Sequence, residues 1–159
     1  MNVYFSLGSN IGSKRSNLNA AKKMLAMYVG PVIAQSKLYV SEPWGNEEQN
    51  DFINQCLICE SNLSCMDILK LSQQIEVQLG KNKKEYWGPR LIDIDILFYG
   101  NSIIENKDLV IPHPFLHKRN FVLEPLNKIS PEFIHPVLKK SINELYHISK
   151  DHKKTCIIC

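Results

Sequence analysis

Two aspartates stand in the middle of a segment that otherwise has the composition of a buried strand. The segment is "LIDIDILFY" (residues 91–99), in which one isoleucine separates Asp93 from Asp95. Successive strand side chains point to opposite faces, so both carboxylates share one face, with their Cα atoms roughly 6.5–7 Å apart. Two carboxylates this close repel each other unless a cation or strong donors lie between them. The spacing predicts a hard-cation site, most simply for Mg²⁺, which commonly binds one or two carboxylates plus substrate phosphates. The alternative is an exposed face with two solvated carboxylates.

A basic loop directly precedes the two aspartates. It reads "KNKKEYWGPR" (residues 81–90) and holds four cationic side chains: Lys81, Lys83, Lys84 and Arg90. Cations beside metal-binding carboxylates are typical of a triphosphate site, where they neutralise the charge that moves during transfer. Gly80 and Gly88 bracket the loop and would let it move as a lid. A lysine run by itself is more often a solvated loop.

Two other segments carry residues suited to binding. In "IPHPFLHKRNF" (residues 111–121), His113 lies between two prolines that stiffen the backbone, and the Arg119 guanidinium can fork onto a phosphate. In "FINQCLICE", Phe52 and Asn54 share one face of a predicted strand. That pair suits a flat heterocycle that needs stacking and edge hydrogen bonds, although core packing would explain the phenylalanine equally well.

The elements that must position these residues follow the order β-α-β-β-α-β. Alternating or apolar runs predict strands at 2–8, 32–40, 52–60 and 91–99, and apolar residues at helical spacing predict helices at 14–30 and 65–80. Ser13 and Ser64 are the expected N-caps and Gly80 the expected C-cap. This is the order of the ferredoxin-like α+β fold, in which two helices cover one face of an antiparallel sheet and leave the other open. We expect the aspartates on the open side, followed by a hairpin at 101–111 and a short helix-rich C-terminal appendage.

Length and composition are those of one soluble globular domain spanning residues 1–159. Hydrophobic residues make up 44% of the chain and charged residues 22%. The net charge of +3 does not require nucleic acid but suits an anionic small substrate. No apolar run approaches the roughly 20 residues that span a bilayer, and the N-terminus lacks a secretion signal, so we expect a cytoplasmic protein.

The five cysteines are an odd number, which favours a reducing compartment over a disulfide scaffold. Cys56 with Cys59 and Cys156 with Cys159 have the C-x-x-C spacing of zinc sites. Strand residues three apart face opposite sides, so the first pair cannot ligate one ion, and a zinc site is disfavoured. The terminal "CIIC" has the outline of a prenylation motif with an atypical last residue. We expect instead a frayed tail with incidental thiols.

Four segments form a distinctive series: "YVSEPWGNEEQNDFIN", "IEVQLGK", "YWGPRLIDIDILFYG" and "IPHPFLHKRNFVLEPL". In this order and spacing they resemble the 6-hydroxymethyl-7,8-dihydropterin pyrophosphokinase family of folate biosynthesis, over nearly the whole chain. The W-G-P-R-x-x-D-x-D block is the most specific part. The resemblance implies a ferredoxin-like fold and transfer of the terminal diphosphate of ATP to the pterin hydroxymethyl group, with release of AMP. It also implies two Mg²⁺ ions and ATP as co-substrate.

Position by position, the resemblance implies site residues in each segment. Asp93 and Asp95 correspond to the metal ligands, and Lys81, Lys83 and Arg90 to cations that assist the transfer. The residues that correspond to the nucleotide site are Gln73, Glu76, Arg90, Ile96, His113 and Arg119. Those that correspond to the pterin pocket are Ser41, Pro43, Trp44, Phe52, Asn54 and Phe121, with Trp87 as a lid residue near both sites. Lys81 and Lys83 stand where some members have arginines, so we expect them to act as point charges without a bidentate fork.

Two other functions fit parts of the pattern. Another two-metal enzyme of the same architecture, such as a nucleotidyl transferase, would release pyrophosphate rather than AMP. A ferredoxin-like RNA-binding module would need the K/R-G-F/Y-x-F signature, which the sequence lacks, and acidic residues on its open face would repel RNA. We therefore expect small-molecule substrates, no nucleic acid, no membrane association and a monomer.

Overall fold

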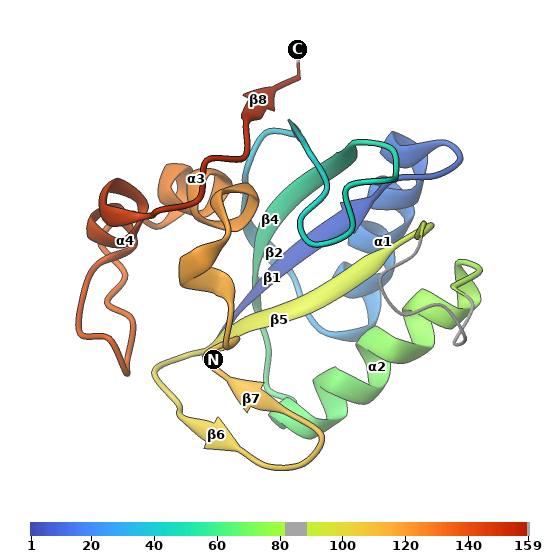
Figure 1. Cartoon of the computed structure of the whole chain (residues 1–159). Helices are drawn as coiled ribbons and strands as arrows, with labels where there is room; N and C mark the ends of the chain where they lie inside the picture. Colours follow the sequence, from blue (N-terminus) through green and yellow to red (C-terminus); the bar gives the residue numbers. More distant parts are fainter. Residues whose placement is uncertain (82–88, 159) are drawn as a thin grey trace.

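The computed structural model describes residues 1–81 and 89–158. Within them, the centre of the fold is a six-stranded antiparallel sheet (Figure 1). Its strands are β1 (Asn2–Ser9), β2 (Val32–Gln35), β3 (Tyr39–Ser41), β4 (Phe52–Glu60), β5 (Asp93–Tyr99) and β8 (Thr155–Ile157). Their spatial order is β5-β1-β4-β3-β8, with β2 also paired to β4. The predicted α+β class is thus confirmed.

Helices α1 (Lys14–Tyr28) and α2 (Cys65–Gln78) cover one face of this sheet (Figure 1). The buried cluster between them and the sheet contains alternate residues of β1 and β5, among them Phe5, Leu7, Ile94 and Ile96. The isoleucine side of β5 therefore packs on the helices, as its alternation predicts. Ser64 caps α2 through a hydrogen bond from the Asp67 N–H. The Ser13 side chain makes no such bond to α1.

The other face is not left open, contrary to the sequence-based expectation. A 3₁₀ turn η1 (Leu116–Lys118) leads into α3 (Asn120–Ile129), and α3 and α4 (Ile142–Ile148) cover part of that face. Their cluster with the sheet includes Tyr4, Phe98 and Leu126. Helix α3 is not predicted from the sequence, because Pro125 lies inside it and removes one helical hydrogen bond. The uncovered part of this face lies over the first residues of β5 and the last residues of β1.

Two further segments differ from expectation. The predicted strand at 32–40 is two strands, because the Ser36 side chain accepts a hydrogen bond from the Cys56 N–H and interrupts regular pairing. The predicted frayed tail is strand β8, which pairs with β3. The hairpin predicted at 101–111 is present as β6 (Ile104–Glu105) and β7 (Val110–Ile111). Cys56 and Cys59 belong to the clusters on opposite faces of the sheet, as predicted.

Strand β5 contains a β-bulge at Leu97. On β1, Phe5 pairs with Ile96 and Tyr4 with Phe98, so Leu97 has no partner. Leu97 and Phe98 both belong to the cluster with α3 and α4. The face of β5 that starts with two carboxylates therefore ends as an apolar surface.

Among the described residues, no helix combines the length and apolar character that crossing a bilayer requires.

Candidate active site

A cavity of about 1250 Å³ opens over the uncovered part of the sheet and extends past the edge of β5 to α2. Its floor is a row of paired residues. Gly8 of β1 pairs with Asp93 on one side and with Asn54 on the other. Next to it, Ser6 pairs with Asp95. The carboxylates and the amide thus lie on one face, which confirms the predicted geometry of the "IDID" and "FIN" segments.

Asp93 is held by two cations. Lys81 Nζ lies 2.8 Å from Asp93 Oδ1, and Arg90 Nη1 forms an ion pair with Asp93 Oδ2. Lys81 also lies 2.9 Å from Glu76 Oε2. The pKa of Lys81 is raised: burial lowers it, but the attraction of Asp93 and Glu76 outweighs burial. Lys81 is therefore a fixed positive charge between two carboxylates.

Glu76 connects α2 to the edge of β5. Its Oε1 accepts a hydrogen bond of 2.7 Å from the Ile94 N–H, a backbone group that faces outward from the sheet edge. Burial raises the pKa of Glu76, and Lys81 and the Ile94 N–H offset part of that effect. The bond fixes the cavity-lining face of α2 relative to the aspartates.

The position of Arg90 is set by Asn10, which is fully buried. Asn10 Oδ1 accepts from the Arg90 N–H at 2.6 Å, and the Asn10 N–H donates to the Arg90 carbonyl at 3.0 Å. Asn10 Nδ2 also donates to Gln49 Oε1 at 2.9 Å. One side chain thus ties the last residue of the basic loop to the loop between β3 and β4.

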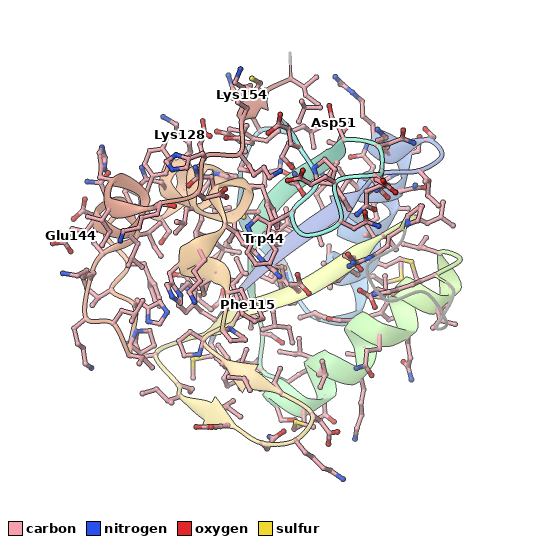
Figure 2. All side chains as sticks on the ribbon, in the orientation of Figure 1. Trp44, Asp51, Phe115, Lys128, Glu144 and Lys154 are labelled. Atoms are coloured by element: carbon pink, nitrogen blue, oxygen red, sulfur yellow. The ribbon has the colours of Figure 1, made fainter. Side chains whose placement is uncertain are left out.

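Arg119 lies among three aromatic rings. Its guanidinium carbon is 4.5 Å from the Trp44 ring centroid, 5.3 Å from that of Phe115 and 5.7 Å from that of Phe121. Figure 2 shows Trp44 and Phe115 next to each other over the sheet, and their centroids are 6.1 Å apart. Burial lowers the pKa of Arg119, and Asp95, at 3.9 Å from Nη1, offsets part of that effect. The rings form a cage suited to a flat or cationic group.

His113 enters the cavity from the segment after β7. Its backbone N–H donates to the Leu97 carbonyl at 3.0 Å, and its Nδ1 accepts from the Phe115 N–H at 3.2 Å. Burial lowers the pKa of His113, with a smaller opposing effect from Asp95. An accepting Nδ1 leaves Nε2–H as the group that can donate to a ligand.

Within the described residues, the side-chain amide of Asn54 is held by one hydrogen bond, made through its nitrogen. Its Nδ2 donates to Ser41 Oγ at 2.6 Å, and both residues are buried. The Asn54 oxygen lies 3.1 Å from the point where a Cβ on Gly8 would stand, and the Phe52 ring lies 3.6 Å from it. Gly8 therefore leaves open the space between the amide, the ring and Asp93.

The structure brings most of the predicted site residues together. The cavity lining includes Ser41, Trp44, Phe52, Asn54, Gln73, Glu76, Lys81, Arg90, Asp93, Asp95, His113, Arg119 and Phe121. Pro43 is buried and does not line the cavity, and the Ile96 side chain packs in the core. Strand alternation turns the Ile96 side chain to the face opposite Asp95, so the nucleotide contact predicted for this residue would have to involve its backbone. Lys83, Trp87 and the predicted lid lie outside the described residues.

Sequence reasoning missed several residues of this site. Phe115 and Lys70 line the cavity, and Asn10 positions Arg90. For Lys70 a signal existed, since it lies three and four residues before Gln73 and Gln74 and so shares their helix face. For Asn10 none existed, because its partner is 80 residues away.

The carboxylates fit a hard divalent cation. The side chain of Asp95 is 43% exposed, and its ion-pair contact with Arg119 is long, at 3.9 Å, so its oxygens remain accessible from the cavity. Asp93, 16% exposed, is the more enclosed of the two. Two carboxylates beside three cations can hold Mg²⁺ together with phosphate oxygens. The polar floor and the aromatic cage would then take a flat group next to a phosphate chain.

Several known proteins are similar to this chain over most of its length. A model of the family described as 7,8-dihydro-6-hydroxymethylpterin-pyrophosphokinase (HPPK) matches residues 4–131. The 2-amino-4-hydroxy-6-hydroxymethyldihydropteridine pyrophosphokinase of Aquifex aeolicus (strain VF5) is 39% identical over 142 residues, which are 89% of this chain and 88% of that protein. The protein of the same name from Bacillus subtilis (strain 168) is 38% identical over 128 residues, 80% of this chain and 77% of its own.

Solved structures show the same fold. Wild-type HPPK-DHPS of Plasmodium falciparum superposes with a TM-score of 0.72 at 17% identity. The match covers 92% of this chain and 44% of that longer chain. At this identity the likeness concerns the fold alone.

Proposed function

The chain belongs to the 7,8-dihydro-6-hydroxymethylpterin-pyrophosphokinase family, and we propose how its cavity carries out the reaction. The protein is a pyrophosphokinase of folate biosynthesis that uses ATP as co-substrate. The hydroxymethyl oxygen of the dihydropterin attacks the β-phosphorus of ATP. The bond from that phosphorus to the oxygen bridging the α- and β-phosphates breaks, AMP leaves, and the hydroxyl proton is released.

The triphosphate binds at the β5 side of the cavity. Lys81, Arg90 and Arg119 supply positive charge there, and the buried Nε atoms of both arginines have no hydrogen-bond partner among the described residues. Donors left unpaired and close to a cavity favour an anionic ligand that accepts from them. Gln73 and Glu76 on α2, together with His113, complete the nucleotide side. We place the adenosine end toward α2, where Lys70 also lines the wall.

The pterin binds at the β4 side. Asn54, oriented by Ser41, presents its amide oxygen to the edge of the heterocycle. Phe52 and Phe121 supply aromatic faces for stacking, and Trp44 closes the side toward the loop after β3. The ring would take the place that the Arg119 guanidinium holds between the aromatic side chains.

Asp93 and Asp95 would hold the magnesium ions, two in our proposal. Bound Mg²⁺ withdraws charge from the phosphate oxygens and orients them. The chain's own cations contribute in the same direction: Lys81 and Arg90 neutralise Asp93 before substrate arrives and face the phosphates afterwards. The fixed floor of the sheet sets the angle between the two substrates.

The observation that carries this proposal is the row Asp93–Gly8–Asn54 across three paired strands. It supports a phosphate-and-metal end next to a heterocycle end, because the residue between Asp93 and Asn54 in this row is a glycine. The test is to incubate the protein with ATP, Mg²⁺ and 6-hydroxymethyl-7,8-dihydropterin and to separate the nucleotides. We expect AMP and pterin diphosphate to form in equal amounts. Release of pyrophosphate with transfer of AMP would instead identify a nucleotidyl transferase.

We further propose that the protein acts as a single domain and a monomer in the cytoplasm. Three of its cysteines, Cys56, Cys59 and Cys65, are buried free thiols, which suits a reducing compartment. Light scattering of the purified protein, with and without both substrates, tests the monomer. A mass of twice 18.3 kDa or more under either condition would contradict it.

A further inference from the structure

The C-terminal segment of residues 151–158, here called the C-terminal strap, contacts both walls of the pterin pocket. It follows α4, runs past α3 and ends in β8, the strand at the β3 edge of the sheet (Figure 1). Thr155 pairs with Ser41, and the Ile158 N–H donates to the Leu38 carbonyl at 2.9 Å. The strap lies wholly beyond residues 4–131, which match the family model.

On one wall, Asp151 caps helix α3 from outside. Its Oδ2 accepts a hydrogen bond of 2.8 Å from the Asn120 N–H, and its carbonyl accepts one of 2.7 Å from Asn120 Nδ2. The residue at the N-cap position, Arg119, makes no side-chain capping bond. A helix start has unpaired N–H groups and a positive dipole end, so an external carboxylate stabilises it. Asn120 lies between Arg119 and Phe121, the two α3-side residues of the pocket.

On the other wall, the strap holds the loop between β3 and β4. Lys153 forms an ion pair with Glu47, and the Lys154 N–H donates to Glu42 Oε2 at 3.3 Å. Trp44 lies between Glu42 and Glu47 in the chain. The Lys153 N–H also donates to Asp151 Oδ1 at 3.0 Å. The Asp151 carboxylate thus bonds both Asn120 on the first wall and Lys153, which holds the second wall.

We propose that the C-terminal strap sets the width of the pterin pocket, with Asp151 as the positioning residue. Asp151 fixes the start of α3, and with it Phe121 and Arg119, while the following lysines hold the loop that carries Trp44. Among the described residues of the nucleotide side, Arg119 is held through the strap, whereas Lys81, Arg90 and Glu76 are fixed by β5 and Asn10. This inference rests on the proposed assignment of the pocket to the pterin.

The test compares Asp151→Ala with Asp151→Asn and with Asp108→Ala as a control. Asp108 lies exposed in the β6–β7 hairpin, outside the cavity lining. We expect Asp151→Ala to raise the KM for pterin about tenfold and the KM for ATP by no more than about threefold, because the strap holds both walls of the pterin pocket but, on the nucleotide side, Arg119 alone. Asp151→Asn keeps an oxygen that accepts from the Asn120 N–H and should recover most of the affinity. Asp108→Ala should match the wild type.

Thermal unfolding of the same variants separates positioning from general stability. A lower Tm for Asp151→Ala with both KM values unchanged at a temperature where all variants are folded would overturn the proposal, as would equal rises in both. A second variant that ends after Ser149 removes the whole strap and should show the same split more strongly. If the wild type releases no AMP, the proposed function fails. If the wild type is active and Asp151→Ala behaves like it, only the role of the strap fails.

Discussion

Asp93 and Asn54 lie on opposite sides of Gly8 on one face of the sheet, because β1 pairs with both of their strands at that residue. Two strand spacings place their Cα atoms roughly 9.5–10 Å apart. The proposed reaction therefore takes place above a residue without a side chain, where the hydroxymethyl group meets the phosphate chain. The backbone of Gly8 is in an ordinary extended conformation, which any residue can adopt. The role of glycine here is therefore to keep the space above the strand free of a side chain.

Gly8→Ala should separate stability from activity. Alanine loses less chain entropy than glycine, so we expect stability equal to the wild type or up to ~1 kcal/mol higher. The new methyl group would press on the Asn54 oxygen and the Phe52 ring. We expect the KM for pterin to rise at least about tenfold, equivalent to about 1.4 kcal/mol. Urea unfolding and steady-state kinetics measure both effects. Unchanged kinetics in a fully folded variant would show that this space is not used.

Asp95→Asn and Asp93→Asn should each lower turnover by about a hundredfold or more while the protein stays folded, since charge stabilisation of transferring phosphates has this order of magnitude. Asp95 is the more exposed of the two, so its loss should mainly weaken the response to Mg²⁺. Loss of Asp93 also leaves Lys81 and Arg90 without their shared partner. Single-turnover rates over a Mg²⁺ titration distinguish these effects. Near-normal rates for either variant at ordinary Mg²⁺ concentrations would remove that residue from the metal site.

Asn54→Ala should raise the dissociation constant of the pterin far more than that of ATP. Losing a fixed amide contact to a ligand costs about 1–3 kcal/mol. Gln55→Ala is a matched control, because this neighbour loses a buried amide that bonds the Ser36 carbonyl rather than facing the cavity. Calorimetry with each ligand gives both constants. Equal weakening of pterin and ATP by Asn54→Ala would argue against a role on the pterin side.

His135 should make the protein less stable in mild acid. Burial lowers the pKa of His135 to about 4, and its Nδ1 accepts from the Val137 and Leu138 N–H groups. The unfolded chain binds a proton near the ordinary pKa of 6.5, whereas the folded protein does not until about 4. The contribution of this histidine is thus fully present above pH 6.5 and is lost as pH falls from 6.5 toward 4. Between pH 7.5 and 5 the loss should be about 2 kcal/mol.

The matched variant for this effect is His135→Asn, whose amide oxygen can accept from the same backbone groups but does not titrate. Urea unfolding at both pH values gives the difference. We expect the wild type to lose about 2 kcal/mol more than the variant over this interval. Parallel behaviour of the two proteins would mean that His135 titrates normally.

The features that can be predicted from the sequence are those in which apolar residues recur at the short period of a strand or a helix. The alternation around Asp93 and Asp95 fixes their shared face, and helical spacing finds α1 and α2. Pairings between distant segments leave no such pattern. Tyr39 pairs with Ile157, and Asn10 bonds Arg90, across 118 and 80 residues. The predicted frayed tail and the missed role of Asn10 both follow from this limit.

Local rules also fail where tertiary packing overrides them. Pro125 argues against a helix, yet the apolar contacts of Val122, Leu123 and Leu126 under α3 hold one there. The cage around Arg119 assembles from Trp44, Phe115 and Phe121, which belong to two distant parts of the chain. Single residues in the sequence indicate neither the cage nor its occupant.

The bulge in β5 has a consequence for how the histidine segment is attached. Removing Leu97 would leave every other pair between β1 and β5 in place, so sheet formation does not need this residue. Its carbonyl accepts the hydrogen bond from the His113 N–H at 3.0 Å. The extra residue, two positions after Asp95, thus provides a hydrogen-bond acceptor that attaches the segment containing His113 to the sheet. The histidine proposed to bind the nucleotide is thereby attached to the same strand as the aspartates, and its distance from them depends on a single surplus amino acid in that strand.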